Sequence, residues 1–517
     1  MISSRTPGKS FLNEAVYRDK VLGCWTGKNI GGTLGAPMEG KQQTWDIHFY
    51  TQDLGGVPAP NDDLDLQLAW LKAVEEVGVY NVDEKVLGRA WLRWVTGPWN
   101  EYGIGKMNMI NGLQPPLSGL CNNEVWKNSN GAWIRSEIWA CLFPGEPDEA
   151  AHLAWCDACV DHAGDGIYAE IFTATLESAA FIESDLRKLI GYALLRIPAD
   201  CRVARSVKIA CDCYDQGLPW LEARNKIVED SADLGWFQAP ANVAFAVVGL
   251  LYGEGDFGKS VCLAVDCGDD TDCTGATCGS VLGIIKGRSG IPKEWIEPIG
   301  ESIQTVAVNT AGSYPKFPVT LDELTDRVLA CKRYADAANP TLVRLTDGET
   351  TISAEHLERL DTGKKVETNV LSKSSRAMEL PTPWGNLEIE FEKSPVVTPG
   401  ETQQLTLRFR SGYYLNSILQ VHWQLPAGWS IAEGDTQALL GYVTLFSETK
   451  ITLTAGDFND GFLCHIPLHF SLNTQNYPAA GFVTFQRAGT MGSNIRFNVD
   501  IKYLEREDRT FTRINGK

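Results

Sequence analysis

In the first two-thirds of the chain, apolar residues recur at helical spacing. The stretch LDLQLAWLKAVEEV places Leu64, Leu68, Leu71 and Val74 on one face of a helix. Similar patterns occur near residues 84–96, 148–161, 166–183, 201–215, 241–252, 272–286 and 319–337. No series of alternating strand patterns separates these segments. The sequence therefore predicts an all-α domain, which we place at residues 1–340.

One predicted helix carries a glycine at every fourth position, at Gly23, Gly27, Gly31 and Gly35. This spacing puts small residues on one side of a helix, where a second helix can approach closely. Lys28 and Asn29 lie in the same stretch and exclude a membrane helix. Because the chain has no long apolar run, we expect no membrane partner.

Beyond residue 340 the pattern changes. Residues 341–383 are polar and irregular and predict a connector. From Trp384 onward, apolar and polar residues alternate in NLEIEFE, QQLTLRFR, ILQVHWQL, YVTLF, ITLTA, FLCHIPLHF, GFVTF and IRFNVDIKYL, with turn sequences such as TPGE and PAGW between them. Many short strands separated by turns are typical of a β-sandwich. We predict a multidomain chain in which an all-β sandwich occupies residues 384–517.

The net charge limits the classes of binding partner, and the cysteines indicate the cellular compartment. The chain has 46 Lys and Arg against 65 Asp and Glu, a net charge of −19, which argues against a nucleic-acid partner. The first residues contain no apolar signal segment and the 14 cysteines are scattered, so we expect free thiols and a cytoplasmic protein. No pattern indicates an oligomeric state.

Two acidic clusters precede predicted helices: Asn61, Asp62 and Asp63, and then Asp269, Asp270 and Asp272. Helix capping and the helix dipole account for acids at such positions. However, a helix N-terminus offsets only about half a unit charge, which is less than each cluster carries. If both clusters face one cleft, their oxygens favour Mg²⁺, Mn²⁺ or Ca²⁺.

Four motifs follow one another in this chain: YRDKVLGCWTGKNIGGTLGAPMEG, NDDLDLQLAWL, SNGAWIRSEIWACLFPGEPDEAAHLAWCDACVDHAGDGIYAE and CGDDTDCTGATCGSVLGIIKG. Together they resemble the ADP-ribosylglycohydrolase family, which includes the dinitrogenase-reductase-activating glycohydrolase and the ADP-ribosyl-acceptor hydrolases. The resemblance runs from about residue 17 to residue 335. It implies an all-α domain with a binuclear Mg²⁺ or Mn²⁺ centre that hydrolyses an N- or O-glycosidic bond of a ribofuranose.

The resemblance implies metal ligands at Asn61, Asp62, Asp63, Asp270, Asp272 and Cys273. Asp272 would bridge the metals, and Cys273 replaces a threonine of the family pattern. Because a hard cation binds a thiol poorly, one or two ions are expected, Mg²⁺ or Mn²⁺ with Ca²⁺ as an alternative. Gly32 stands where the family has an aspartate, whereas Glu39 is retained. The implied catalytic carboxylates are Glu39, Asp62 and Asp63.

The resemblance also implies a substrate side, formed by Asn130, Gly131, Arg135, His162, Tyr168 and Asp269. Two of these have a structural alternative, since Arg135 fits an internal salt bridge and His162 fits a packed helix histidine. Asp269 stands where the family has glycine, and we expect it to face the substrate.

The sequence predicts a metal-dependent hydrolase of a small-molecule glycoside, either an ADP-ribosyl substrate or another furanosyl-type glycoside. The altered metal motifs, the acidic charge and the sandwich favour a glycoside other than ADP-ribosyl. The alternative is a catalytically inactive relative that binds a sugar or nucleotide.

Overall fold

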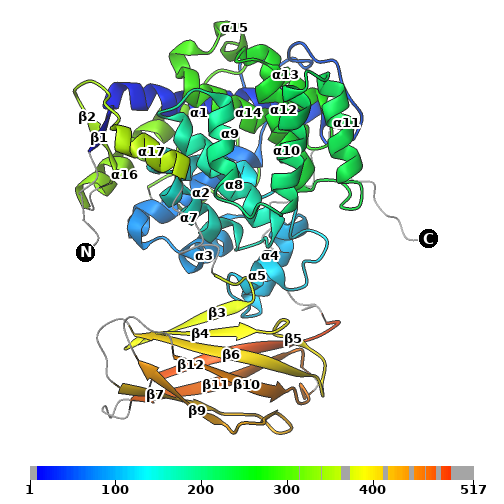
Figure 1. The fold of residues 1–517 in the computed structure, drawn as a ribbon, viewed down its shortest axis with the longest axis vertical. Coiled ribbons are helices and arrows are strands. Elements are labelled where there is room, and N and C mark those ends of the chain that lie inside the picture. Colours follow the sequence, from blue (N-terminus) through cyan, green and yellow to red (C-terminus); the bar gives the residue numbers. More distant parts are fainter. Residues whose placement is uncertain are drawn as a thin grey trace.

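The computed structural model describes residues 9–313, 315–338, 341–362, 373–411, 417–441, 447–459, 461–472 and 479–490. The chain forms a helical domain and a β-sandwich that lies against one end of it (Figure 1). In the described part of the chain, no helix has the length and apolar character needed to cross a membrane. All 14 cysteines are free thiols.

The helical domain follows the predicted helical pattern. Its helices are α1 (Glu14–Gly35), α2 (Asp62–Val77), α3 (Glu84–Trp94), α4 (Asn100–Ile110), α5 (Leu117–Leu120), α6 (Glu137–Leu142), α7 (Pro147–Ala158), α8 (Asp165–Ala180), α9 (Leu186–Leu194), α10 (Arg202–Asp215), α11 (Trp220–Asp230), α12 (Ala239–Tyr252), α13 (Phe257–Asp266), α14 (Thr271–Lys286), α15 (Lys293–Ile296), α16 (Leu321–Ala338) and α17 (Ala354–Thr362). Each segment with predicted helical spacing is helical, whereas the sequence pattern did not predict α4, α5, α6, α9, α11, α13, α15 and α17.

A close contact between α1 and α14 organises the helical domain. The two helices run antiparallel, and the glycines face one another in the pairs Gly23 and Gly283, Gly27 and Gly279, and Gly31 and Gly275. A Cβ atom placed on Gly27 would lie 1.9 Å from the carbonyl oxygen of Gly279. Only glycine permits this approach, so the predicted packing face is confirmed. The contact ends where Gly35 meets Thr271, at the first turn of α14.

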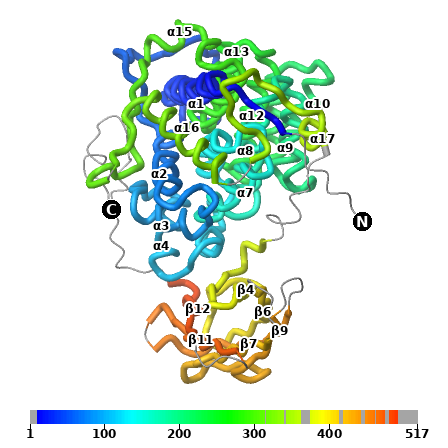
Figure 2. Tube along the Cα trace, turned by 90° about the vertical axis from the view of Figure 1, so that its left-hand side faces the viewer, coloured from blue at the N-terminus to red at the C-terminus, as the bar shows by residue number. Residues whose placement is uncertain are grey.

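The sandwich contains two sheets packed face to face, as Figure 2 shows. One sheet has the strand order β3 (Ala377–Thr382), β4 (Gly385–Phe391), β6 (Thr402–Ser411), β10 (Ser447–Thr454) and β8 (Ser430–Ile431). The other has the order β5 (Val396–Val397), β12 (Ala479–Arg487), β11 (Leu463–Leu472), β7 (Ser417–Trp423) and β9 (Thr436–Gly441). Alternate residues of β6, among them Leu405, Leu407 and Phe409, are buried between the sheets, as the period-two pattern predicts.

Residues 341–383, predicted to be a connector, contribute to both domains in their described part. Within this range, β2 (Val343–Thr346) pairs in parallel with β1 (Ser10–Asn13) of the helical domain. β3 pairs with β4, so the sandwich begins before Trp384. These short strands carry no clear alternation of their own and form because a partner strand is available. The predicted strands YVTLF and IRFNVDIKYL lie outside the described residues.

The sandwich docks on the segment that runs from the end of α4 through α5. Leu113, Leu117 and Cys121 are at most 3% exposed and belong to the hydrophobic core of the sandwich rather than to that of the helical domain. Asn122 donates from Nδ2 to Gln486 Oε1 of β12 at 3.2 Å. The two domains therefore share part of one core.

Candidate active site

The packing of three helices brings the acidic motifs to one cavity. Asn61 caps α2 by accepting a hydrogen bond from the Asp63 N–H at 2.7 Å, so the first motif occupies the first turn of α2. The contact of α1 with α14 places Glu39, which follows α1, beside the second motif at the start of α14. The cavity has a volume of about 160 Å³ and is lined by Ala36, Glu39, Pro60, Asp62, Trp99, Asn100, Glu101, Tyr102, Ser129, Asn130, Gly131, Ile134, Phe237, Asp270, Asp272 and Cys273.

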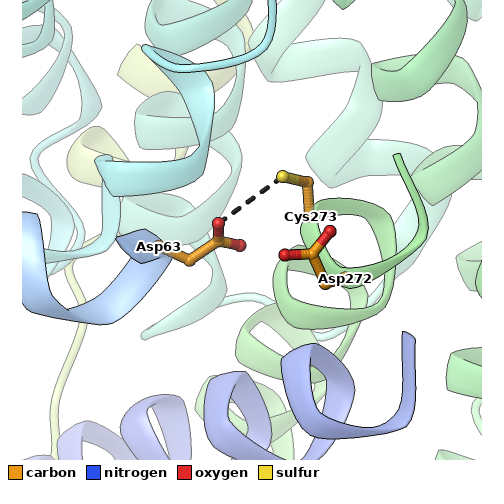
Figure 3. Close-up of side chains that lie close together, drawn as sticks. All are labelled: Asp63, Asp272 and Cys273. Carbon is orange, nitrogen blue, oxygen red and sulfur yellow. Dashed lines mark hydrogen bonds between the residues drawn. The ribbon is translucent and has the colours of Figure 1, made fainter. Parts of the chain in front are cut away.

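Two sets of side chains are close enough to hold a cation. In the inner set, Asp63, Asp272 and Cys273 offer ligand atoms within 4.8 Å of one another. In the outer set, Glu39, Asp270 and Asp272 do the same. Asp272 belongs to both sets, the position that the resemblance assigns to a bridging ligand. Figure 3 shows the inner set, in which Asp63 on α2 faces Asp272 and Cys273 on α14.

Neighbouring side chains orient the carboxylates that line the cavity. Asn130 donates from Nδ2 to Asp270 Oδ2 at 2.7 Å. Its own amide oxygen accepts a hydrogen bond from Trp133 Nε1 at 3.0 Å, which fixes the amide. The Tyr102 hydroxyl donates to Asp62 Oδ2 at 3.2 Å. The carboxylates are therefore held in place by side chains from the opposite wall.

Burial and crowding disfavour the charged forms of Asp63, Asp270 and Cys273. Burial raises the pKa of Asp63 well above its usual range, although Lys28 Nζ lies 3.8 Å from its Oδ2 and acts in the opposite sense. Burial and the neighbouring Asp272 raise the pKa of Asp270 in the same way. Burial and nearby carboxylates also raise the pKa of the Cys273 thiol, which donates to Asp63 Oδ1 at 3.5 Å. A bound cation reverses such shifts because it stabilises the deprotonated ligands.

Two carboxylate oxygens in the inner set fit a cation. Asp63 Oδ2 and Asp272 Oδ1 are buried and have no hydrogen-bond partner among the described residues. Buried polar atoms without a partner are rare, because the lost hydration costs free energy. Carboxylate oxygens are also the ligands that Mg²⁺, Mn²⁺ and Ca²⁺ prefer. These residues therefore fit the metal that the resemblance implies.

Gly32 and Asn61 depart from the family pattern together. A Cβ atom on Gly32 would lie 2.1 Å from Asn61 Nδ2, so the Asn61 amide fills space that an aspartate at position 32 would need. The Asn61 oxygen already accepts the hydrogen bond that caps α2. The geometry gives Asn61 a structural role, and its role as a metal ligand stays a prediction.

Arg135 does not reach the cavity, unlike Asn130 and Gly131, which line it. Its fully buried guanidinium donates to Asp157 Oδ1 at 3.0 Å and to Asp161 Oδ1 at 2.7 Å. It also donates to the carbonyl oxygen of Gly131 at 2.6 Å. Arg135 therefore forms the internal salt bridge and supports the wall from behind, and its predicted contact with substrate stays a prediction.

His162 lies one layer behind the cavity wall. Its Nδ1 is 2.8 Å from Asp161 Oδ1, and its Nε2 is 3.2 Å from Ser129 Oγ and 3.8 Å from Glu101 Oε1. The imidazole is fully buried, whereas Ser129 and Glu101 line the cavity. His162 therefore contacts two residues that line the cavity, and its predicted contact with substrate stays a prediction.

Tyr168 and Asp269 are the other two predicted substrate residues that the structure keeps out of the cavity. Tyr168 is half-buried and packs against the core of the helical domain. The Asp269 carboxylate accepts hydrogen bonds from the Phe237 N–H at 3.3 Å and from Asn242 Nδ2 at 3.2 Å. Its backbone, at a φ of 68°, pairs with Lys41. Asp269 thus fixes the loop before α14, and its predicted contact with substrate stays a prediction.

The structure adds cavity residues that sequence reasoning missed, among them Trp99, Glu101, Tyr102 and Phe237. Glu101 is only 6% exposed, and its Oε2 has no hydrogen-bond partner among the described residues. Burial raises its pKa. The sequence WNEYG, an acidic residue among aromatic residues, could have indicated this part of the cavity. It is equally typical of an ordinary helix start.

The sequence model of the ADP-ribosylglycohydrolase family matches residues 13–332. A solved structure described as an ADP-ribosylglycohydrolase-related protein complex is similar at 19% identity with a TM-score of 0.43, and the match covers 62% of this chain and 99% of that chain. A search of curated protein sequences gave no match. Because the family match spans more than half of the chain and includes both acidic motifs, the protein belongs to the ADP-ribosylglycohydrolase family.

Proposed function

We propose that the protein is a metal-dependent hydrolase that cleaves an N- or O-glycosidic bond of a small-molecule glycoside. The observation that carries this proposal is the pair of ligand sets that share Asp272 beside one cavity. Membership of a glycohydrolase family supports hydrolysis as the reaction class. The fold alone does not identify the sugar, so the substrate class is argued from the cavity.

The metal ligands are the inner and outer sets, which would hold one or two divalent cations. Such a cation polarises sugar oxygens and stabilises the charge that develops during hydrolysis. The chain prepares this site by fixing Asp270 through Asn130 and Asp62 through Tyr102. These hydrogen bonds limit the reorganisation needed when a substrate binds.

Glu101 is the carboxyl group best placed to donate a proton to the leaving group. Burial raises its pKa, and its Oε2 has no partner among the described residues although Glu101 lines the cavity. A carboxyl group whose pKa is raised is better suited to general acid catalysis than one with an ordinary pKa. Glu39 and Asp62 also line the cavity and remain as bases that activate water. Asp63 is fully buried, which favours a ligand role over a base role.

The charge of the cavity favours an uncharged glycoside over an ADP-ribosyl group. Among the described residues, its lining contains no Lys, Arg or His but includes the carboxyl groups of Glu39, Asp62, Glu101, Asp270 and Asp272. A pyrophosphate group would therefore find no cationic side chain in the lining with which to pair. Trp99, Tyr102 and Phe237 offer aromatic faces that suit the apolar face of a sugar. We rank furanosyl glycosides first among the candidate substrates.

A metal-supplemented activity screen tests this function. The full chain, stripped of metal and reloaded with Mg²⁺ or Mn²⁺, is offered chromogenic furanosides, chromogenic pyranosides and ADP-ribosylated arginine. We expect turnover of a furanoside that stops with chelator and in Asp272→Asn. Turnover that persists after complete chelation would contradict the metal-dependent mechanism.

The alternative is a relative that binds a sugar or nucleotide without cleaving it. It predicts that metal raises the melting temperature and that a glycoside raises it further, while no product forms. The same protein samples, assayed for binding and for product, separate the two functions.

A further inference from the structure

The two ligand sets differ in their chemistry. The outer set offers oxygen atoms only, from Glu39, Asp270 and Asp272. The inner set adds the sulfur of Cys273 to the oxygens of Asp63 and Asp272 (Figure 3). Sulfur ligands favour zinc and similar transition metals, whereas sets made only of oxygen favour Mg²⁺ and Mn²⁺. The two positions therefore should not select the same ion.

One ligand pair of the inner set has the spacing expected at a zinc site. A Zn–S distance of about 2.3 Å and a Zn–O distance of about 2.0 Å, at a tetrahedral angle, separate the two ligand atoms by about 3.5 Å. Cys273 Sγ and Asp63 Oδ1 lie 3.5 Å apart. Asp63 Oδ2 and Asp272 Oδ1 are also buried without a hydrogen-bond partner among the described residues, although Lys28 Nζ lies 3.8 Å from the former. The set therefore offers oxygen ligands as well as sulfur.

The surroundings also distinguish the two sets. Asp63 is fully buried and Cys273 is 5% exposed, whereas Glu39 of the outer set is exposed. Lys28 lies behind Asp63, and its Nζ donates to Glu137 Oε1 at 2.6 Å. The inner position is thus enclosed, which suits a tightly held ion. The outer position is open to exchange with solvent.

We propose that the centre is heterometallic, with a zinc-class ion bound by the Cys273 thiolate, Asp63 and Asp272, and with Mg²⁺ or Mn²⁺ in the outer set. On binding, the S–H bond of Cys273 breaks, its proton leaves to solvent and a metal–sulfur bond forms. This inference shares one premise with the proposed function, which is that these residues bind metal ions. It does not require that the protein hydrolyses a glycoside. It is tested by metal binding, so its failure differs from a failure to hydrolyse glycosides.

Cobalt spectroscopy of the full chain tests the metal–sulfur bond. Metal-free protein is titrated with Co²⁺ in excess Mg²⁺, and the sulfur-to-cobalt charge-transfer absorption is recorded. We expect the band in the wild type and in Cys278→Ser, which removes another buried thiol from α14. We expect no band in Cys273→Ser. A wild type without the band, or a Cys273→Ser variant that keeps it, would overturn the proposal.

Competition for Zn²⁺ with a chelator provides a second measurement, on a variant that carries threonine at position 273. Cys273→Thr restores the threonine of the family pattern, so it should keep metal binding while losing the preference for zinc. We expect its Zn²⁺ affinity, measured against a chromogenic chelator in excess Mg²⁺, to fall by more than about tenfold, since even residues behind the ligands have effects of that size. Equal zinc affinity in the wild type and in folded Cys273→Thr would overturn the proposal.

Discussion

The two walls of the cavity are built by different physical means. On the metal wall, α1 and α14 meet backbone to backbone at glycines, and the ligands stand at the ends of these helices and of α2. On the substrate wall, Asn130 and Gly131 rest on a buried layer of charged side chains centred on Arg135. The metal wall therefore tolerates no added volume, whereas the substrate wall tolerates no loss of charge.

The largest effect should follow from added volume on the metal wall. In Gly27→Val the new Cβ would lie 1.9 Å from a backbone oxygen that cannot move alone, so we expect the helical domain to fail to fold. Circular dichroism and melting would show this loss. The control is Gly191→Ala in α9, where nothing lies within 4 Å of the added atom. The free energy of unfolding of Gly191→Ala should rise by up to about 1 kcal/mol. Equal stability of the two variants would contradict the claim that the α1–α14 contact tolerates no added volume.

Removing the central charge of the substrate wall should have the next largest effect. Arg135→Met leaves Asp157 and Asp161 buried without their cation, which should cost about 3–5 kcal/mol in urea unfolding. The control is Arg187→Met, which removes an exposed ion pair with Asp215 and should cost less than about 1 kcal/mol. Similar losses in both variants would mean that the buried layer has no special role.

Metal binding at the metal wall should raise the free energy of unfolding of the protein. Saturating Mg²⁺ or Mn²⁺, at about 100 times the dissociation constant, should add about 2.7 kcal/mol to the free energy of unfolding. Asp272→Asn should abolish this gain because it weakens both ligand sets at once. Thermal melting with metal and with chelator measures the effect, and an unchanged metal shift in Asp272→Asn would exclude the shared ligand.

The buried carboxyl groups behind the substrate wall should stabilise the fold at low pH and less as pH rises. An ordinary ion pair has the opposite pH dependence. Burial and the adjacent Asp157 raise the pKa of Glu170 well above its usual range, and burial raises the pKa of Asp157 to about 6. The stabilising contribution of such raised groups is complete below about pH 4 and is lost as pH rises through the folded-state pKa values. Glu170→Gln should gain stability relative to the wild type between pH 4 and 7.5, as urea unfolding would show. Parallel pH profiles would contradict this.

The smallest effect should come from the domain contact. Gln486→Ala removes the hydrogen bond to Asn122 and should cost about 1 kcal/mol. Metal affinity should not change, because neither Gln486 nor Asn122 belongs to the ligand sets or lines the cavity. Isothermal titration with Mn²⁺ checks this, and an altered metal affinity would show that the sandwich reaches the metal wall.

The sequence predicts the metal wall better than the substrate wall. Glycine spacing and adjacent aspartates are local patterns with one main physical cause each, so α1, α14 and the aspartates could be found without the fold. The roles of Arg135, Asp269 and Glu101 depend on which way a side chain points after packing. Arg135 turns to Asp157 and Asp161, Asp269 turns to its own loop, and Glu101 turns to the cavity. No spacing rule contains that information.

The pairing of β1 with β2 brings residues near the start of the helical domain beside residues that follow α16, with Ser10 opposite Val343 in parallel register. Nearly the whole catalytic scaffold lies between these strands in the chain, because the family match covers residues 13–332. A domain whose ends meet can be inserted into a loop of another protein without stretching either chain. The segment between β1 and β2, which carries every helix from α1 to α16, therefore begins and ends at one point of the fold.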